Sequence, residues 1–345
     1  MIKTNLLLSL LFFLLFCIGS IGLNAQKNTL DSLKNELQAR QQRDTVTVDL
    51  LNQIASKAYR QDIGKTIQYA EEAKALSDSL NYPDGKAKYI YLLGIIQALR
   101  SDFDQAISVF KQAYAAYQTI DGANKKDKIM CLQGIAAASY DMNDYQQAIQ
   151  YAKQAIAGYE SISENSGVAY MRNTLGITYR EIGAYDSCLI EHRKALSIFE
   201  QEGNEKGISH CLNNMGIVYE DHGDYPRALE NYMKSLAIDE KLGNNRDIAI
   251  ALNNIGSIHN DLEEYHKALT FYSKALTFWE EQGDRKEGAG AKINIGRSYY
   301  KMNRYDSATH YFRQALEESK QIGDVRLQAG SYINRASMEF SRENY

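Results

Sequence analysis

The sequence predicts an all-α fold, a solenoid of stacked antiparallel helix pairs, and three observations carry this prediction. One glycine recurs every 40 residues from Gly176 to Gly296, and a second recurs with the same spacing from Gly203 to Gly323. A tyrosine recurs every 40 residues from Tyr185 to Tyr345. The chain holds only 2 prolines in 345 residues, which suits long helices, because proline inside a helix costs about 3 kcal/mol. A fixed period of this length is typical of arrays in which each repeat buries its apolar face against its neighbours.

The first 25 residues differ from the rest of the chain. Lys3 supplies a positive charge, residues 6–23 are almost continuously apolar, and the small residue Ala25 follows. This order predicts a signal peptide over residues 1–25, and therefore an exported protein that is periplasmic or secreted. A retained membrane anchor is the alternative, because an apolar run of about 18 residues is near the minimum that spans a bilayer. Lipid attachment at Cys17 is disfavoured, because the bulky Phe16 precedes it.

Residues 26–45 form the next segment. Leu30, Leu33 and Leu37 follow one another at helical spacing, so we expect one amphipathic capping helix over residues 29–42 and a short linker before the array.

Each repeat is expected to contain two helices, and residues 207–246 illustrate why. Apolar and small residues recur at steps of three and four in two stretches, separated by His222-Gly223-Asp224. The first stretch holds Leu212, Met215, Gly216 and Tyr219, and the second holds Ala228, Tyr232, Ser235 and Leu236. Gly243 follows the second stretch, where a left-handed glycine can close a helix. The Asn or Asp after each such glycine is expected to help start the next helix.

Small residues occupy one position in each helix. In the first helix they are Gly94, Ala136, Gly176, Gly216, Gly256, Gly296 and Ala336. In the second they are Ala106, Ala148, Cys188, Ala228, Ala268 and Ala308. A mid-helix glycine costs roughly 0.5–1 kcal/mol relative to alanine, so its repetition predicts close packing between the two helices.

Taken together, these residues resemble the tetratricopeptide repeat (TPR) family. The motif appears as Gly216–Tyr219–Tyr225–Ala228–Tyr232 and again 80 residues later from Gly296 to Phe312. Its 40-residue length, and the Leu-Gly or Ile-Gly steps preceded by Asn, are similar to the longer repeats of kinesin light chains and Leu-Gly-Asn scaffolds. The resemblance covers residues 46–345, as about seven full repeats and a half repeat. It implies a right-handed TPR superhelix whose first helices line a concave groove that binds proteins or peptides.

An asparagine row supplies the candidate binding residues. Asparagines precede the small residue of the first helix at Asn173, Asn213, Asn214, Asn253, Asn254, Asn294 and Asn334, and Arg172 and Arg297 lie beside them. An amide can both donate to and accept from a peptide backbone. Two interpretations are open: the row binds a peptide or protein in the groove, or it forms hydrogen bonds between successive first helices and holds the pitch of the superhelix.

The sequence shows no motif for catalysis, metals or cofactors. No pair of histidines has metal-ligand spacing, and no phosphate-binding glycine loop or nucleophile motif occurs. His192 and His259 take positions that hold tyrosine in other repeats, so both are expected to pack between helices. The pairs Glu220-Asp221 and Glu263-Glu264 are expected at solvent-facing turns. A net charge of −4 with scattered basic residues gives no sign of nucleic-acid binding. Cys131, Cys188 and Cys211 are expected as small core residues.

The printed sequence stops at Tyr345, the position that begins the second helix of other repeats. The last first helix would then lack its partner, so we expect this sequence to be part of a longer protein; a true end with a frayed helix is the alternative. A leader followed by 40-residue repeats also resembles the front of bacterial signalling proteins. The alternative function is therefore a periplasmic sensory region of a longer protein with a histidine kinase, cyclase or helix-turn-helix output. Membrane contact is expected only through an uncleaved leader or a transmembrane helix beyond this sequence.

Overall fold

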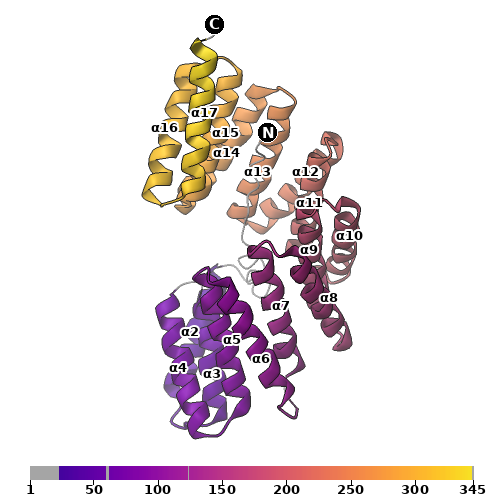
Figure 1. Ribbon diagram of the computed structural model, residues 1–345, viewed down its shortest axis with the longest axis vertical. Helices are drawn as coiled ribbons and strands as arrows, with labels where there is room; N and C mark the ends of the chain where they lie inside the picture. The colour runs from indigo at the N-terminus through magenta and orange to yellow at the C-terminus, as the bar shows by residue number, and fades with distance from the viewer. Residues whose placement is uncertain (1–22, 60–61, 123, 344–345) are drawn as a thin grey trace. The chain divides into compact units, whose positions relative to one another are not determined.

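The computed structural model describes residues 23–59, 62–122 and 124–343, and throughout these ranges the regular structure is helical (Figure 1). The all-α solenoid prediction is confirmed. The chain divides after Glu202 into two compact units, residues 1–202 and 203–345, and each is described by itself. The predicted leader falls largely on residues 1–22, outside the described residues. Within the described part of the chain, no helix is long and apolar enough to cross a membrane.

The first unit contains nine described helices: α2 (Leu23–Ala39), α3 (Thr45–Ala58), α4 (Ile63–Ser79), α5 (Pro83–Leu99), α6 (Phe103–Gln118), α7 (Lys125–Asp141), α8 (Tyr145–Ser161), α9 (Asn165–Glu181) and α10 (Tyr185–Gln201). The described residues of the second unit form α11 (Glu205–Asp221), α12 (Tyr225–Leu242), α13 (Asn245–Asp261), α14 (Tyr265–Gln282), α15 (Arg285–Lys301), α16 (Tyr305–Gln321) and α17 (Val325–Glu343).

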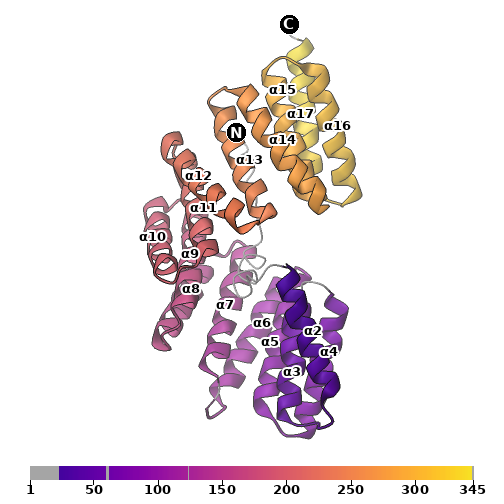
Figure 2. The same ribbon diagram turned by 180° about the vertical axis from the view of Figure 1, so that it is seen from behind.

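Consecutive helices pair side by side within each unit (Figures 1 and 2). The odd-numbered helices from α3 to α17 are the first helices of their pairs, and the even-numbered helices from α4 to α16 are the second helices. Each second helix packs on its own first helix and, within a unit, on the first helix of the next pair. First helices also contact one another: α3 with α5 and α5 with α7 in the first unit, and α11 with α13, α13 with α15 and α15 with α17 in the second. α2 packs against α3, where Leu30 is buried with Leu50 and Ile54.

The turns between helices rely on left-handed residues. Gly203, Gly243, Gly283 and Gly323 have φ between 65° and 72°, as the 40-residue glycine row predicted. Asn204, Asp284 and Asp324 then cap the following helix by accepting a backbone N–H with the side chain. Asn244 differs, because its side chain instead donates to Asp247.

Small residues on the first helices receive large side chains from the second helices. A Cβ added at Gly216 would lie 2.6 Å from the ring of Tyr232, and one at Gly256 would lie 2.8 Å from Tyr272. The same close approach joins Gly94 to Phe110, Gly176 to His192 and Gly296 to Phe312. Ala136 is accommodated in its repeat because the facing position holds the small Ala152. The predicted close packing is therefore confirmed, and the ring 16 residues later explains the glycine.

The two units differ in their cores. In the first, one cluster of buried apolar residues runs from α3 to α9 and includes Phe110, Ile135 and Tyr159. In the described part of the second, buried apolar residues form smaller clusters around Trp279, Phe312 and Tyr272. Cys131, Cys188 and Cys211 are buried, as expected of small core residues.

Candidate binding face

Amide side chains join the first helices of the second unit. The Nδ2 of Asn254 on α13 donates to the Oδ1 of Asn213 on α11 at 3.0 Å. One repeat later, the Nδ2 of Asn294 on α15 donates to the Oδ1 of Asn253 on α13 at 3.1 Å. All four side chains are half-buried. We call these four residues the amide row.

The register of the helices explains this pairing. Asn253 and Asn254 are adjacent on α13, and adjacent positions on a helix point about 100° apart, so Asn254 reaches α11 and Asn253 reaches α15. Asn294 stands 40 residues after Asn254, and Asn213 stands 40 residues before Asn253. The 40-residue repeat therefore builds a continuous row across α11, α13 and α15.

Hydroxyl and carboxylate groups extend the contacts between the same helices. Ser257 donates to the Oε1 of Glu220 at 2.9 Å, and Ser298 donates to the Oδ1 of Asn260 at 2.9 Å. The expectation that Glu220 lies at a solvent-facing turn is wrong. Its second oxygen accepts from the hydroxyl of Tyr232 at 2.7 Å, and burial raises the pKa of the Glu220 carboxyl.

Two predicted groove residues of the first unit contact second helices instead. The guanidinium of Arg172 on α9 donates to Glu160 of α8 at 2.9 Å and to Glu191 of α10 at 2.8 Å. The amide oxygen of Asn173, 2% exposed, lies 2.8 Å from the Nδ1 of His192. Burial lowers the pKa of His192 to about 3, so the ring is neutral and donates to this amide oxygen. His192 is thus packed between helices, as predicted.

The remaining predicted residues take three different positions. Asn214 is buried on α11 at 9% exposure. Asn334 on α17 donates to the carbonyl oxygen of Gly330, one turn earlier on its own helix. Arg297 on α15 is half-buried and lies one turn beyond Asn294. Burial raises the pKa of the Tyr272 phenol, and the nearby charge of Arg297 lowers it by a smaller amount. Arg297 is therefore the predicted arginine that lies nearest to the amide row along the chain.

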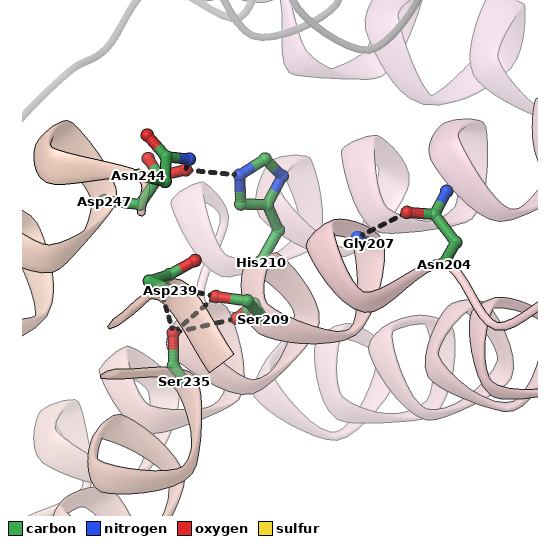
Figure 3. A network of polar contacts seen from close by, with 8 residues as sticks. All are labelled: Asn204, Gly207, Ser209, His210, Ser235, Asp239, Asn244 and Asp247. Atoms are coloured by element: carbon green, nitrogen blue, oxygen red, sulfur yellow. Dashed lines mark hydrogen bonds and ion pairs between the residues drawn. The ribbon is translucent and has the colours of Figure 1, made fainter. Parts of the chain in front are cut away.

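A second polar cluster, which sequence reasoning did not identify, joins α11 to α12 and to α13 (Figure 3). Ser209 of α11 donates to the Oδ2 of Asp239 on α12 at 2.7 Å and lies 2.8 Å from the Oγ of Ser235. His210 turns toward α13, where its Nε2 lies 3.2 Å from the Oδ2 of Asp247. The signal was available in the sequence, because most other repeats have alanine at the positions of Ser209 and Ser235.

These bonds attach neighbouring side chains to different helices. Ser209 is tied to α12 and His210 to α13, so serine, histidine and aspartate do not form the chain of contacts that activates a nucleophile (Figure 3). Among the described residues, no group of three or more His, Cys, Asp or Glu side chains is placed to hold a metal ion. The cluster therefore links α11 to α12 and to α13 by polar contacts between side chains.

The family model for the tetratricopeptide repeat matches residues 87–161, 167–241 and 247–320, which together make up more than half of the chain. No curated protein sequence matches.

Solved structures with the same fold include a signal transduction ATPase with a tetratricopeptide repeat sensor from Pyrococcus horikoshii. It is 17% identical, with a TM-score of 0.68, and the match covers 96% of this chain and 48% of that one. NprR in complex with its cognate peptide NprX is 16% identical, with a TM-score of 0.58 and coverage of 86% and 84%. A Rap protein complexed with Competence and Sporulation Factor is 14% identical, with a TM-score of 0.63 and coverage of 91% and 92%.

Proposed function

Because this chain belongs to the tetratricopeptide repeat family, we propose that it is a non-enzymatic scaffold that binds an extended segment of a protein or peptide along the first helices of its second unit. The amide row carries the proposal. It places four half-buried amides on three successive first helices, α11, α13 and α15, at a spacing set by the repeat itself.

The chemistry of the amide row suits a peptide backbone. Each carboxamide has two N–H donors and an oxygen with two lone pairs, and the bond within the row uses one of these on each partner. The Nδ2 groups of Asn213 and Asn253 and the Oδ1 atoms of Asn254 and Asn294 therefore retain bonding capacity. A ligand bound there exchanges hydrogen bonds with water for hydrogen bonds with the row, each worth about 0.5–1.5 kcal/mol net.

The similar structures support this class of ligand. NprR was solved with its cognate peptide, and a Rap protein was solved with Competence and Sporulation Factor. Both share the fold of this chain at low sequence identity, so the identity of the ligand does not transfer.

A random peptide library displayed on phage tests the proposal directly. The full chain is used as bait, and selected 12-residue peptides are measured by calorimetry against the wild type, Asn213→Ala/Asn253→Ala and Asn231→Ala. Asn231 is a matched control, because its amide donates to the carbonyl oxygen of Arg227 on the exposed side of α12. We expect the double variant to weaken binding at least about tenfold, or roughly 1.4 kcal/mol, and the control to leave it unchanged. Selected peptides that bind all three proteins equally would remove the amide row from the site.

We further propose that the protein is exported, on the basis of the apolar run at residues 6–23 that follows Lys3. Expression with a C-terminal reporter active only outside the cytoplasm tests this, compared with a variant in which Leu11 and Leu14 are replaced by Arg. Reporter activity that is absent from the wild type contradicts export.

A sensory region of a longer signalling protein is the second candidate. The repeats of the Pyrococcus protein are described as a sensor, and this chain spans about half of that protein. Reading the gene beyond codon 345 decides between the candidates. A transmembrane segment followed by a kinase, cyclase or DNA-binding domain supports the sensor, and a stop codon or further repeats alone supports the scaffold.

A further inference from the structure

Three buried residues make the joint between α11, α12 and α13 unlike the equivalent joints of the same chain. Ser209 stands where three other repeats have Ala169, Ala249 and Ala289. Ser235 stands where others have Ala155, Ala195, Ala275 and Ala315. Asp239 stands where others have Tyr159, Phe199 and Trp279. Where those repeats have small and aromatic residues, this joint has two hydroxyls and a carboxylate, which can form hydrogen bonds with one another.

The three side chains form a closed group in the interior. Ser209, Ser235 and Asp239 are each 1% exposed. The hydroxyls of Ser209 and Ser235 lie 2.7 Å and 3.3 Å from the same carboxylate oxygen, Oδ2 of Asp239 (Figure 3). Ser235 also contacts the backbone oxygen of Ser209 at 3.1 Å, which ties α12 to α11.

The other carboxylate oxygen is left without a partner. Oδ1 of Asp239 is buried and has no hydrogen-bond partner. An ionised carboxylate shares its charge between both oxygens, so the charged form places negative charge on a buried, unsatisfied atom. A proton on Oδ1 removes that charge and leaves Oδ2 free to accept from the two serines. The geometry therefore favours the neutral acid whenever the joint is closed.

The charged groups around Asp239 come from both helices that pack against α12. Asp247 on α13 adds negative charge, and His210 on α11 adds positive charge when it is protonated. Lys206 and Arg246 lie near Asp247 and act on that carboxylate. Burial by itself raises the pKa of Asp247, but the hydrogen bond and the charge of His210 outweigh it, and its pKa lies below the ordinary value. Asp247 thus stays negative beside Asp239.

We propose that the α11–α12–α13 joint is a proton-controlled joint, which is closed when Asp239 is neutral and opens more readily when Asp239 is charged. Burial, the orphaned Oδ1 and the negative Asp247 act in this direction, and they outweigh the two serine hydrogen bonds and the charge of His210, which favour the ionised carboxylate. No equivalent group is present at the α13–α14–α15 joint, where Ala249, Ala275 and Trp279 fill the same positions.

The direction of the pH dependence follows from the two states of the joint. Burial, helped by the charge of Asp247, raises the pKa of Asp239 from 3.8 to about 6. The closed joint therefore holds a proton, between about pH 4 and pH 6, that the open joint releases. Its stability is highest at low pH, falls as pH rises through this window, and is constant above it.

The joint lies next to the proposed binding face. Asn213 follows Ser209 by one turn on α11, and Asn254 follows Asp247 by two turns on α13. Opening between α11 and α13 would break the bond between Asn213 and Asn254. Proton binding at Asp239 would then hold the amide row in register, a consequence that rests on the proposed function, whereas the joint itself does not.

Hydrogen–deuterium exchange of the full chain at pH 4.5 and pH 7.5, expressed as protection factors, tests the joint without any ligand. For wild type we expect protection of residues 205–261 to fall roughly ten- to thirtyfold at the higher pH, relative to residues 285–321 of the same molecule. Asp239→Asn keeps the shape and removes the titration, so its relative protection should not change between the two pH values. A wild type without this relative change, or an Asn variant that retains it, overturns the proposal.

A second variant tests the proposal without placing a buried amide at position 239, which could prevent folding. Ser209→Ala/Ser235→Ala/Asp239→Phe copies the residues at these positions in the neighbouring repeat, Ala169, Ala195 and Phe199. Its joint should be as protected at pH 7.5 as at pH 4.5. If its relative protection still changed between the two pH values as much as that of wild type, another group would be responsible for the titration. That result would contradict the assignment to Asp239. Neither result depends on peptide binding, so failure of the joint and failure of the binding proposal are separate outcomes.

Discussion

The two units share one 40-residue plan but join their first helices with different chemistry. In the first unit, the contact between α5 and α7 belongs to a continuous apolar core that includes Ile95, Ile135 and Ala138, with an ion pair of Lys88 and Asp127 beside it. In the second unit, amides, hydroxyls and carboxylates span from α11 to α13 and from α13 to α15. Apolar contacts give stability that is not directional, whereas polar contacts fix a register and leave groups that respond to ligands and protons. The fold therefore accepts either apolar or polar contacts between its first helices. We place the proposed binding function in the second unit, where these contacts are polar.

The largest expected effect is a loss of stability when the apolar core of the first unit is disrupted. Phe110 is 1% exposed, and its ring lies against Gly94 and Gly134 of two successive first helices. Phe110→Ala removes a ring that the surroundings cannot replace, and we expect the free energy of unfolding of the first unit to fall by about 3–5 kcal/mol. Urea denaturation followed by circular dichroism measures the loss. Phe110→Leu should cost less, and equal losses for the two variants would contradict the packing argument.

A smaller loss is expected where a polar contact of the second unit is cut. Tyr232→Phe keeps the ring against Gly216 but removes the hydroxyl that donates to Glu220. The half-buried carboxylate then loses one of its two hydrogen bonds, which should cost about 1–3 kcal/mol. The same urea experiment measures it. Phe312 stands at the equivalent position two repeats later and lacks a hydroxyl by nature, so the fold itself accepts phenylalanine there. An unchanged unfolding midpoint would show that Glu220 does not depend on this bond.

The amide row should give a measurable coupling. A double-mutant cycle with Asn213→Ala and Asn254→Ala isolates the hydrogen bond between the two amides. We expect a coupling energy of about 0.5–1.5 kcal/mol in the free energy of unfolding. The control cycle pairs Asn213→Ala with Asn294→Ala, because Asn294 bonds to Asn253 instead. Additive effects in the first cycle would mean that the row contributes no direct bond between α11 and α13.

The smallest expected effect is a gain and concerns the turns that both units share. Glu263 has a left-handed backbone with φ of 61°, at the turn position that holds Gly183 and Gly223 in the two preceding repeats. Glu263→Gly removes the strain of a side chain in this region and should stabilise the second unit by about 0.5–1 kcal/mol, after the added freedom of glycine in the unfolded chain. A thermal unfolding scan measures the shift. Gly223→Glu should destabilise by a similar amount, and two shifts of the same sign would refute the argument.

The sequence predicted the local features of the repeats because those features repeat. The glycines at the turns, the caps at Asn204, Asp284 and Asp324, and the small residue opposite each large ring all follow from local helix geometry. Such features depend on residues a few positions apart or on two helices joined by one short turn. Periodicity also predicted that His192 is packed between helices, since it replaces an aromatic ring.

What the sequence left open concerns partners from different repeats. The asparagine row fitted both a ligand site and a bond between helices. The structure shows that Asn213, Asn253, Asn254 and Asn294 do bond between helices, and it commits Arg172 to Glu160 and Glu191. The error at Glu220 has the same origin. The position of Glu220 near the end of α11 predicted an exposed side chain. In the structure, Ser257 of α13 and Tyr232 of α12 both donate hydrogen bonds to its carboxylate.

The sequence by itself determined the class of the fold, the length of the repeat, the turns and the close approach of paired helices. Each of these is set by short-range backbone preference and by the size of side chains that recur at a fixed spacing. Only the tertiary structure decided which amides meet and that Glu220 is half-buried beneath Ser257 and Tyr232. It also decided that one oxygen of Asp239 accepts from two serines while the other has no hydrogen-bond partner. The physical reason is geometric. Adjacent residues on a helix point about 100° apart, and a hydrogen bond forms only within a distance range of a few tenths of an ångström. A repeating sequence pattern does not specify the helix packing to that precision.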